Sequence, residues 1–228
     1  PWPALLHLLS ECTLARRRVV VTGLGIVSPV GNSVEEAWQN ILAGKSGIAA
    51  VTKFDVSIFP VKFAGEVKNF DITQYISAKD ARRMDDFIHF GLAAGIQAVR
   101  DAGLDKENVV DLERVGVAIG SGIGGLPLIE ATQLEYAAGG VRKVSPFFVP
   151  GSIINMISGN LSIEFGFKGP NIALVSACTT GTHSIGDAAR IIEYGDADVM
   201  VAGGAESTVS PLGMGGFSAA RALSTRND

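Results

Sequence analysis

The most constraining feature of the chain is a short apolar stretch followed at once by a turn of small residues and an amphipathic helix pattern. The apolar stretch, residues 171–175, follows Gly169-Pro170 and predicts a buried strand. The turn spans residues 176–182 and has Cys178 at its centre. Apolar residues then recur at helical spacing at Ile185, Ala188, Ala189 and Ile192. The sequence therefore places Cys178 at the end of a strand and beside the start of a helix.

Two interpretations of Cys178 follow from this position. The free N–H groups and the positive end of a helix dipole favour a thiolate, which is the nucleophilic form of cysteine. A lone cysteine in an apolar context also commonly serves as a small buried hydrophobic residue. The residues alone leave both interpretations open.

Strand and helix patterns alternate along the rest of the chain. Such alternation predicts an α/β layered fold with a largely parallel sheet, and one large domain. No internal repeat at periods of about 20 to 50 residues is present. Strands are expected at 19–25, 61–67, 114–119, 171–175 and 199–203. Helices are expected at 34–43, 80–103, 126–138, 150–166, after Cys178, and at 212–222.

Composition excludes several classes of function. The 228 residues are 47% hydrophobic with a mean hydropathy of +0.31, so the chain can bury a full core. Its net charge of −4, with 18% charged residues, does not indicate the excess of basic residues that is typical of nucleic-acid-binding proteins. No apolar run reaches the roughly 18 to 20 residues of a membrane span. The two cysteines, Cys12 and Cys178, give no disulfide framework, so a reducing cytoplasm is expected.

The first 16 residues do not read as part of the fold. They lack an initiator Met, and the basic cluster at residues 16–18 follows the apolar part, which is the wrong polarity for a secretory signal. We interpret residues 1–16 as an appended remnant, a mistranslated upstream region or a disordered arm.

Two glycine turns suggest a competing, nucleotide-binding function. Gly120, Gly122 and Gly125 satisfy G-x-G-x-x-G after a predicted strand, and the turn at 23–25 gives a partial match. Neither turn is followed, about 20 positions on, by the acidic residue that would hold a ribose hydroxyl. The alternative interpretation is that these glycines only allow the backbone to pack closely at the ends of the strands. The sequence contains no phosphate loop and no metal-ligand spacing.

A cysteine nucleophile usually needs a basic or cationic neighbour, and histidines are few. His7 lies in the N-terminal arm, His89 on a predicted amphipathic helix, and His183 on the helix after Cys178. Structural roles are expected for His89 and His183. Either the base lies on residues that this chain does not contain, or Cys178 is not a nucleophile.

Several motifs in order nevertheless resemble one enzyme family. The chain from Arg17 to Asp228 resembles a β-ketoacyl-[acyl carrier protein] synthase of type II, in the thiolase superfamily. The motifs that carry this resemblance are RRVVVTGLG at 17–25, GSGIGG at 120–125, SPFFVP at 145–150, ACTTG at 177–181, DADVMVAGGAE at 196–206 and GGFSAARALS at 215–224.

The resemblance implies a thiolase-like layered α/β/α fold, and specifically the amino-terminal half of a five-layer α/β/α/β/α architecture. Residues 17–228 would form the N-terminal synthase domain, truncated before the C-terminal half. Cys178 matches the family nucleophile. The family's two catalytic histidines, its supporting lysine and a phenylalanine of the oxyanion hole belong to the second half, which agrees with the missing base.

The implied reaction is fatty acid elongation by decarboxylative Claisen condensation, an acyltransferase activity that needs no cofactor and no metal. The implied partners are acyl carrier protein, in acyl and malonyl forms, and a second copy in a homodimer. Ile123, Phe148, Ala177 and Phe217 match positions at or near the acyl pocket, with Phe148 expected from the partner subunit. Carrier-protein docking is expected at Lys79, Arg82, Arg83, Arg142, Lys143 and Arg221.

Two alternatives stand beside this hypothesis. The first is a non-catalytic partner that shapes an acyl pocket or completes a dimer, and Cys178 argues against it. The second is the nucleotide-binding oxidoreductase domain suggested by the glycine turns.

Overall fold

The central element of the fold is a parallel three-stranded sheet. The computed structural model describes residues 17–104 and 111–227, so the N-terminal arm with Cys12 and His7 lies outside the described residues. The strands are β4 (Asn171–Ile172), β3 (Val115–Gly120) and β5 (Val199–Gly204), in the order β4-β3-β5. β3 and β5 pair over their whole length, from Val115 opposite Val199 to Gly120 opposite Gly204. This sheet confirms the predicted α/β fold class.

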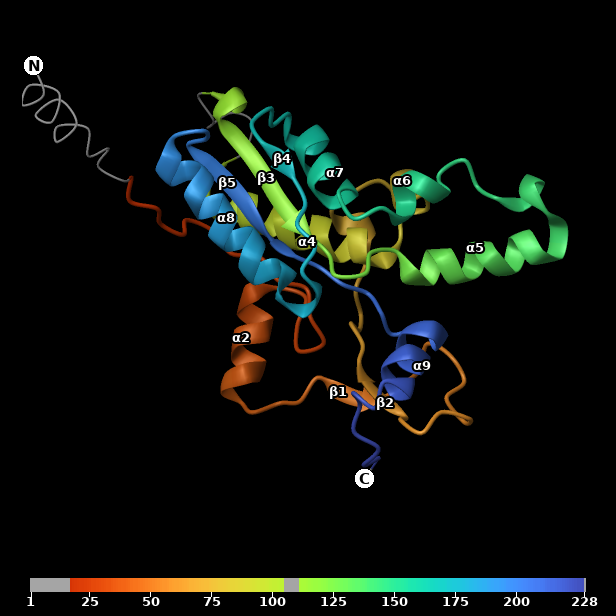
Figure 1. Ribbon diagram of the computed structural model, residues 1–228. Coiled ribbons are helices and arrows are strands. Elements are labelled where there is room, and N and C mark those ends of the chain that lie inside the picture. The colour runs from red at the N-terminus through yellow and green to blue at the C-terminus, as the bar shows by residue number, and fades with distance from the viewer. Residues whose placement is uncertain (1–16, 105–110, 228) are drawn as a thin grey trace, which may run out of the picture.

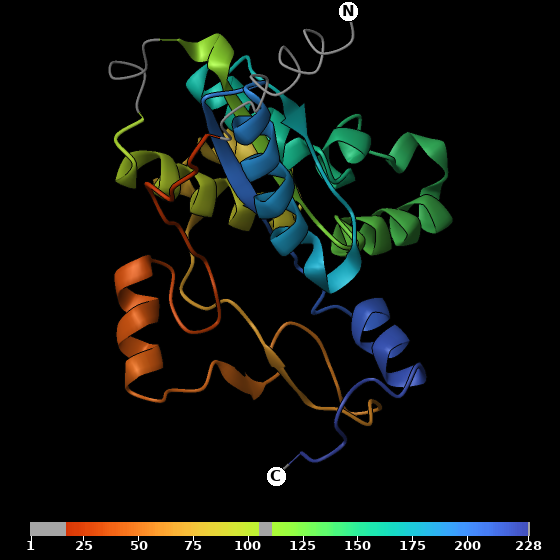
Figure 2. The same ribbon diagram turned by 60° about the vertical axis from the view of Figure 1, so that its left-hand side comes forward.

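Helices cover both faces of the sheet. α8 (Thr180–Tyr194) lies on one face, and α4 (Asp86–Asp101) and α7 (Met156–Phe165) lie on the other (Figures 1 and 2). The apolar stripe expected on α4 is buried throughout, because it packs on the sheet and on α7. Its members are Ile88, Leu92, Ile96 and Val99, each at most 2% exposed. Strands β3 and β5 contribute Val115, Val117, Ile119 and Val201 to the same core, and α7 contributes Ile157 and Leu161.

A second, smaller apolar cluster lies below the sheet in Figure 1. The antiparallel pair β1 (Ile48–Ala50) and β2 (Phe63–Gly65) runs beside α9 (Pro211–Ala219) there. Val51, Val61 and Met214 are its buried members, with four half-buried aromatic or aliphatic side chains of the 54–63 segment around them. α2 (Val34–Leu42) lies at the side of this lower part (Figure 2).

One further long helix and several short helices complete the described chain. α5 (Leu126–Gly139) runs outward from the sheet (Figure 1). The others are η1 (Ile72–Gln74), α3 (Ala78–Ala81), η2 (Leu112–Arg114), η3 (Val141–Lys143), α6 (Phe148–Ser152) and η4 (Ala177–Thr179). Within the described ranges, no helix is both long enough and apolar enough to cross a membrane.

Two predicted helices need correction. The helix expected over 80–103 is split into α3 and α4, because the Asp85 side chain accepts a hydrogen bond from Phe87 N–H and starts a new helix. The helix expected from Pro150 to Gly166 is also split, into α6 and α7. Pro150 lies inside the first turn of α6, where its missing N–H is not needed. The predicted stop is confirmed, since Gly166 ends α7 with a left-handed φ of 71°.

The strand predicted over 19–25 does not join the sheet, so this prediction is wrong. Val20 and Val21 are 63% and 77% exposed. The segment instead bonds to side chains of α4: Leu24 N–H donates to Asp101 and Ile26 N–H donates to Gln97. An apolar β-branched run favours an extended backbone, but it does not specify the partner that satisfies its N–H groups. The strand predicted over 171–175 likewise pairs only at its first two residues.

Candidate active site

Cys178 lies on a sharp turn between β4 and α8. The preceding residue, Ala177, has a φ of +54°, a conformation that costs a residue with a Cβ about 1 to 2 kcal/mol. α8 begins at Thr180, so the Cys178 side chain lies beside the helix N-terminus. The thiol is free and exposed. The structure thus excludes the interpretation of Cys178 as a buried hydrophobic residue.

Hydrogen bonds from α8 hold this turn in its strained conformation. Thr180 Oγ1 accepts from Ser176 N–H at 2.9 Å and donates to Ala177 O at 2.8 Å. The Nδ1 atom of His183 lies 2.7 Å from Ser176 Oγ. The side chain of Thr180 is buried, so these bonds are sheltered from water. The first turn of α8 therefore fixes the backbone that presents Cys178.

The end of β3 also approaches this turn closely. A Cβ at Gly120 would lie 2.1 Å from Leu174 O and 2.6 Å from Thr180 Cγ2. Only glycine fits at this position, because any other residue would push α8 and the segment before Cys178 away from the sheet. This close packing explains why a glycine occupies position 120, at the end of β3.

The turn opens into a hollow of about 520 Å³. Three of the four residues predicted for the acyl pocket line it together with Cys178: Ile123, Ala177 and Phe217. The fourth, Phe148, lies on α6 and is absent from this lining. Apolar side chains next to an exposed thiol suit a substrate with a hydrocarbon chain.

The glycine turn after β3 binds a carboxylate of the same chain. Gly122 N–H and Ile123 N–H donate to Glu206 Oε2 at 2.8 and 3.1 Å, and Ser121 Oγ donates to Glu206 Oε1 at 2.8 Å. A dinucleotide-binding turn would offer such N–H groups to a phosphate. Because Glu206 takes them here, the arrangement argues against the nucleotide-binding hypothesis.

Neither of the histidines that the structure describes serves Cys178 as a hydrogen-bonded base. Between residues 17 and 104 and between 111 and 227, no side chain hydrogen-bonds to the Cys178 sulfur. His183 bonds to Ser176, and His89 on α4 lies 2.9 Å from Ala81 O through Nε2. Both histidines thus have the structural contacts expected for them. In the same ranges, no group of three or more His, Cys, Asp or Glu side chains could hold a metal ion.

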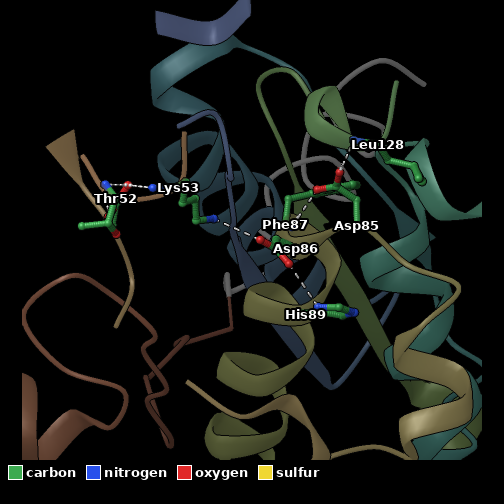
Figure 3. Close-up of polar contacts among 8 residues, drawn as sticks. Thr52, Lys53, Asp85, Asp86, Phe87, His89 and Leu128 are labelled. Carbon is green, nitrogen blue, oxygen red and sulfur yellow. Dashed lines mark hydrogen bonds and ion pairs between the residues drawn. The ribbon is translucent and has the colours of Figure 1, made fainter. Parts of the chain in front are cut away.

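Two adjacent carboxylates at the start of α4 form a separate polar cluster (Figure 3). Asp85 accepts from Phe87 N–H at 3.1 Å and from Leu128 N–H at 2.8 Å, and its burial raises its pKa. A hydrogen bond from His89, together with nearby Lys53, lowers the pKa of Asp86 to about 2. Lys53 Nζ lies 3.1 Å from Asp86 Oδ2.

The residues predicted to dock a carrier protein lie on three separate elements. Lys79 and Arg82 are exposed at α3, and Arg83 follows them. Arg83 is partly engaged within the chain, because its guanidinium lies 4.3 Å above the Phe147 ring and pairs with Asp80. Arg142 and Lys143 are exposed on η3, at the far end of α5, and exposed Arg221 follows α9 (Figure 1).

Sequence reasoning missed the polar residues that support the site, namely Ser121, Ser176, Thr180 and Glu206. A usable signal existed for Glu206. It stands two residues after the end of β5, as Gly122 stands two residues after the end of β3. Two parallel neighbouring strands bring such positions together.

The parallel sheet, the cysteine turn and the apolar hollow define a ketosynthase-type α/β domain. Residues 16–228 match the family described as "Beta-ketoacyl synthase, N-terminal domain", and the chain belongs to this family. A curated relative, 3-oxoacyl-[acyl-carrier-protein] synthase 2 of Vibrio cholerae, is 62% identical over 215 residues, 94% of this chain and 52% of the relative. The chain therefore spans about half the length of that relative.

Solved structures show the same relationship. The ishigamide ketosynthase/chain length factor superposes with a TM-score of 0.81 at 30% identity, over 92% of this chain and 52% of that chain. A ketosynthase bound to a hexaketide, in complex with its type II PKS acyl-carrier protein, gives a TM-score of 0.75 at 27% identity, over 89% of this chain and 54% of that chain. These matches confirm the expectation of a thiolase-like N-terminal half.

Proposed function

We propose that this chain is the nucleophile-bearing half of a β-ketoacyl-[acyl carrier protein] synthase II, an acyltransferase of fatty acid elongation. One observation carries the proposal: Cys178 is presented on a strained turn, at a helix N-terminus, in a hollow lined by Ile123, Ala177 and Phe217. The 62% identity to a 3-oxoacyl-[acyl-carrier-protein] synthase 2 supports the same function.

In the first half-reaction, the Cys178 thiolate attacks the thioester carbonyl of an acyl carrier protein. A carbon–sulfur bond forms to Cys178, the bond to the carrier thiol breaks, and the carrier thiol takes up a proton. Backbone N–H groups at the start of α8 stabilise negative charge on the carbonyl oxygen. Ile123 and Phe217 provide apolar contact for the acyl chain.

Acyl transfer to the purified chain tests this proposal. Incubation with a long-chain acyl thioester should give a covalent acyl adduct on the Cys178 peptide, detected by mass spectrometry. The Cys178→Ala variant should give none at that peptide. An unmodified Cys178 in folded protein, after incubation under conditions that acylate a full-length relative, would contradict the proposal.

In the second half-reaction, malonyl carrier protein loses CO2 and the resulting enolate attacks the acyl-Cys178 thioester. The β-ketoacyl product leaves on the carrier, and Cys178 is regenerated as the free thiol. The resemblance assigns the histidines that stabilise the enolate to the second half of the family fold. The purified chain is therefore expected to form no ketoacyl product from malonyl and acyl thioesters, and measurable product by chromatography would refute this assignment.

Carrier-protein docking is proposed at the basic residues Lys79, Arg82, Arg83, Arg142, Lys143 and Arg221. Since the chain is acidic overall, with a net charge of −4, an acidic carrier protein needs a local basic surface. Arg82→Glu with Arg83→Glu, in a complete enzyme that carries this sequence, should weaken carrier binding at low salt. Lys45→Glu, at an exposed position after α2, is the control, and equal affinity of both variants would rule out docking at Arg82 and Arg83.

We also propose that the complete enzyme is a cytoplasmic homodimer. β4 is an edge strand of the described sheet, and Ile172 within it and Val175 after it are exposed, so its outer side can accept a further strand. Phe148 would enter the acyl pocket of the partner subunit. Light scattering of the complete enzyme should give twice the mass of one chain, and a monomer at micromolar concentration would contradict the dimer.

A further inference from the structure

Glu206 reaches the glycine turn because of the register of two parallel strands. Gly120 pairs with Gly204 at the ends of β3 and β5, and Ala205 N–H donates to Gly120 O at 3.0 Å. The residues that follow β3 and β5 therefore continue side by side. This alignment places the Glu206 side chain against the turn that follows β3.

The carboxylate of Glu206 bonds to three consecutive residues of the turn. Its Oε1 atom accepts from Ser121 Oγ, and its Oε2 atom accepts from the N–H groups of Gly122 and Ile123. Ser121 Oγ in turn accepts from Gly124 N–H at 3.1 Å. A charged acceptor strengthens each of these bonds. The conformation of the whole turn thus depends on one side chain from another strand.

Gly122 brings this carboxylate and the cysteine turn together. A Cβ at Gly122 would lie 2.7 Å from Glu206 Oε2 and 3.1 Å from Ala177 O. The glycine turn is therefore confined between Glu206 and the backbone that presents Cys178. Ile123, the next residue, projects into the same hollow as Cys178 and is 41% exposed.

We propose that Glu206 is a positioning residue that holds Ile123 in the lining of the Cys178 hollow and so limits the length of the chain that reaches the thiol. For an acyl chain, this inference rests on the proposed function. Glu206 acts through the backbone of Gly122 and Ile123. Without its carboxylate, two N–H groups and one hydroxyl lose their acceptor, and the turn is free to move Ile123 out of the lining of the hollow.

Alkylation of Cys178 by maleimides of different length tests the proposal without any acyl transfer. The rates with N-ethylmaleimide and N-octylmaleimide are measured on the Cys178 peptide of the purified chain by mass spectrometry. Glu206→Ala should raise the ratio of the octyl rate to the ethyl rate about fivefold or more, since apolar access discriminates between chain lengths. Glu206→Gln, which keeps one acceptor oxygen, should give an intermediate ratio.

A double-mutant cycle separates positioning of Ile123 from a general loosening of the fold. In an Ile123→Ala background, Glu206→Ala should produce no further change in the ratio, because the side chain through which Glu206 acts is already gone. Glu135→Ala, at an exposed position on α5, should leave the ratio unchanged. If Glu206→Ala fails to fold, the ratio of the octyl rate to the ethyl rate is measured instead for Glu206→Gln and Ser121→Ala, with and without Ile123→Ala.

Two results would overturn the inference: an unchanged ratio in folded Glu206 variants, or the same increase in the Ile123→Ala background. The outcome is independent of the proposed function, because maleimides need neither a carrier protein nor a thioester. A chain that fails to accept an acyl group but shows the expected ratios would contradict acyl transfer and leave the role of Glu206 supported.

Discussion

At the scale of single residues, the site depends on a few polar atoms that hold an unfavourable backbone. Ala177 adopts a positive φ without the freedom of glycine, and Thr180 Oγ1 bonds to both sides of it. A buried N–H without an acceptor destabilises a fold more than an average hydrogen bond stabilises it. Thr180 is therefore more important than its small side chain suggests.

Thr180→Val keeps the shape of the side chain and removes both bonds. We expect it to lower the free energy of unfolding by about 1 to 3 kcal/mol, because the partly buried Ser176 N–H loses its acceptor. Urea unfolding monitored by circular dichroism measures this change. Thr182→Val, at an exposed position on the same helix, is the matched control. Equal stability of the two variants would show that the turn does not need the Thr180 hydroxyl.

At the scale of elements, one buried carboxylate joins two helices. Asp85 caps α4 through Phe87 N–H and also accepts from Leu128 N–H in the first turn of α5 (Figure 3). α5 has no side-chain cap from its own N-cap residue, Gly125. Asp85 thus connects the start of α5 to the start of α4. This connection fixes the position of the first turn of α5 relative to α4.

Asp85→Asn should weaken both helix starts. The amide keeps one acceptor oxygen, so either Phe87 N–H or Leu128 N–H must face an NH2 group. We expect a loss of about 1 to 3 kcal/mol in the free energy of unfolding, measured in urea, and faster hydrogen exchange in the first turn of α5. Asp71→Asn, at the exposed cap of the short η1, keeps the single oxygen that accepts both bonds from Thr73 and should cost clearly less. An equal cost for both would refute the double cap.

At the scale of the whole molecule, an ion pair links the two apolar clusters. Lys53 follows β1 and Val51 of the smaller cluster, and its Nζ pairs with Asp86 at the start of α4 (Figure 3). Asp86 also bonds to His89, and together these contacts hold its pKa at about 2. The ionised carboxylate is therefore favoured by the folded state.

This depressed pKa predicts an acid-sensitive contribution to stability. Since the folded-state pKa lies below the ordinary value of 3.8, the contribution is fully present above pH 3.8 and is lost as the pH falls through about 2. Asp86→Asn should thus be less stable than the parent chain at pH 5, and the difference should shrink toward pH 2. Urea unfolding of both proteins between pH 2 and 5 measures it. A difference independent of pH would exclude ionisation of Asp86 as its cause.

The sequence by itself determined the kind and order of most of the elements, apart from the strand predicted over 19–25 and the breaks that divide two predicted helices. The apolar spacing on α4, the helix pattern of α2 and the turn and helix around Cys178 are local patterns, and local hydrogen bonding follows from them. Ordered motifs also identified the family before any fold was known. The position of Cys178 was predictable for this reason.

Only the tertiary structure decided which elements meet. The sequence did not show that residues 19–25 would bond to α4 and not to the sheet, or that Glu206 would reach a turn 85 residues earlier in the chain. It also did not show that Asp85 would cap a helix 43 residues later. Such contacts depend on strand register and helix packing, which are set by the folded chain as a whole and carry no local pattern.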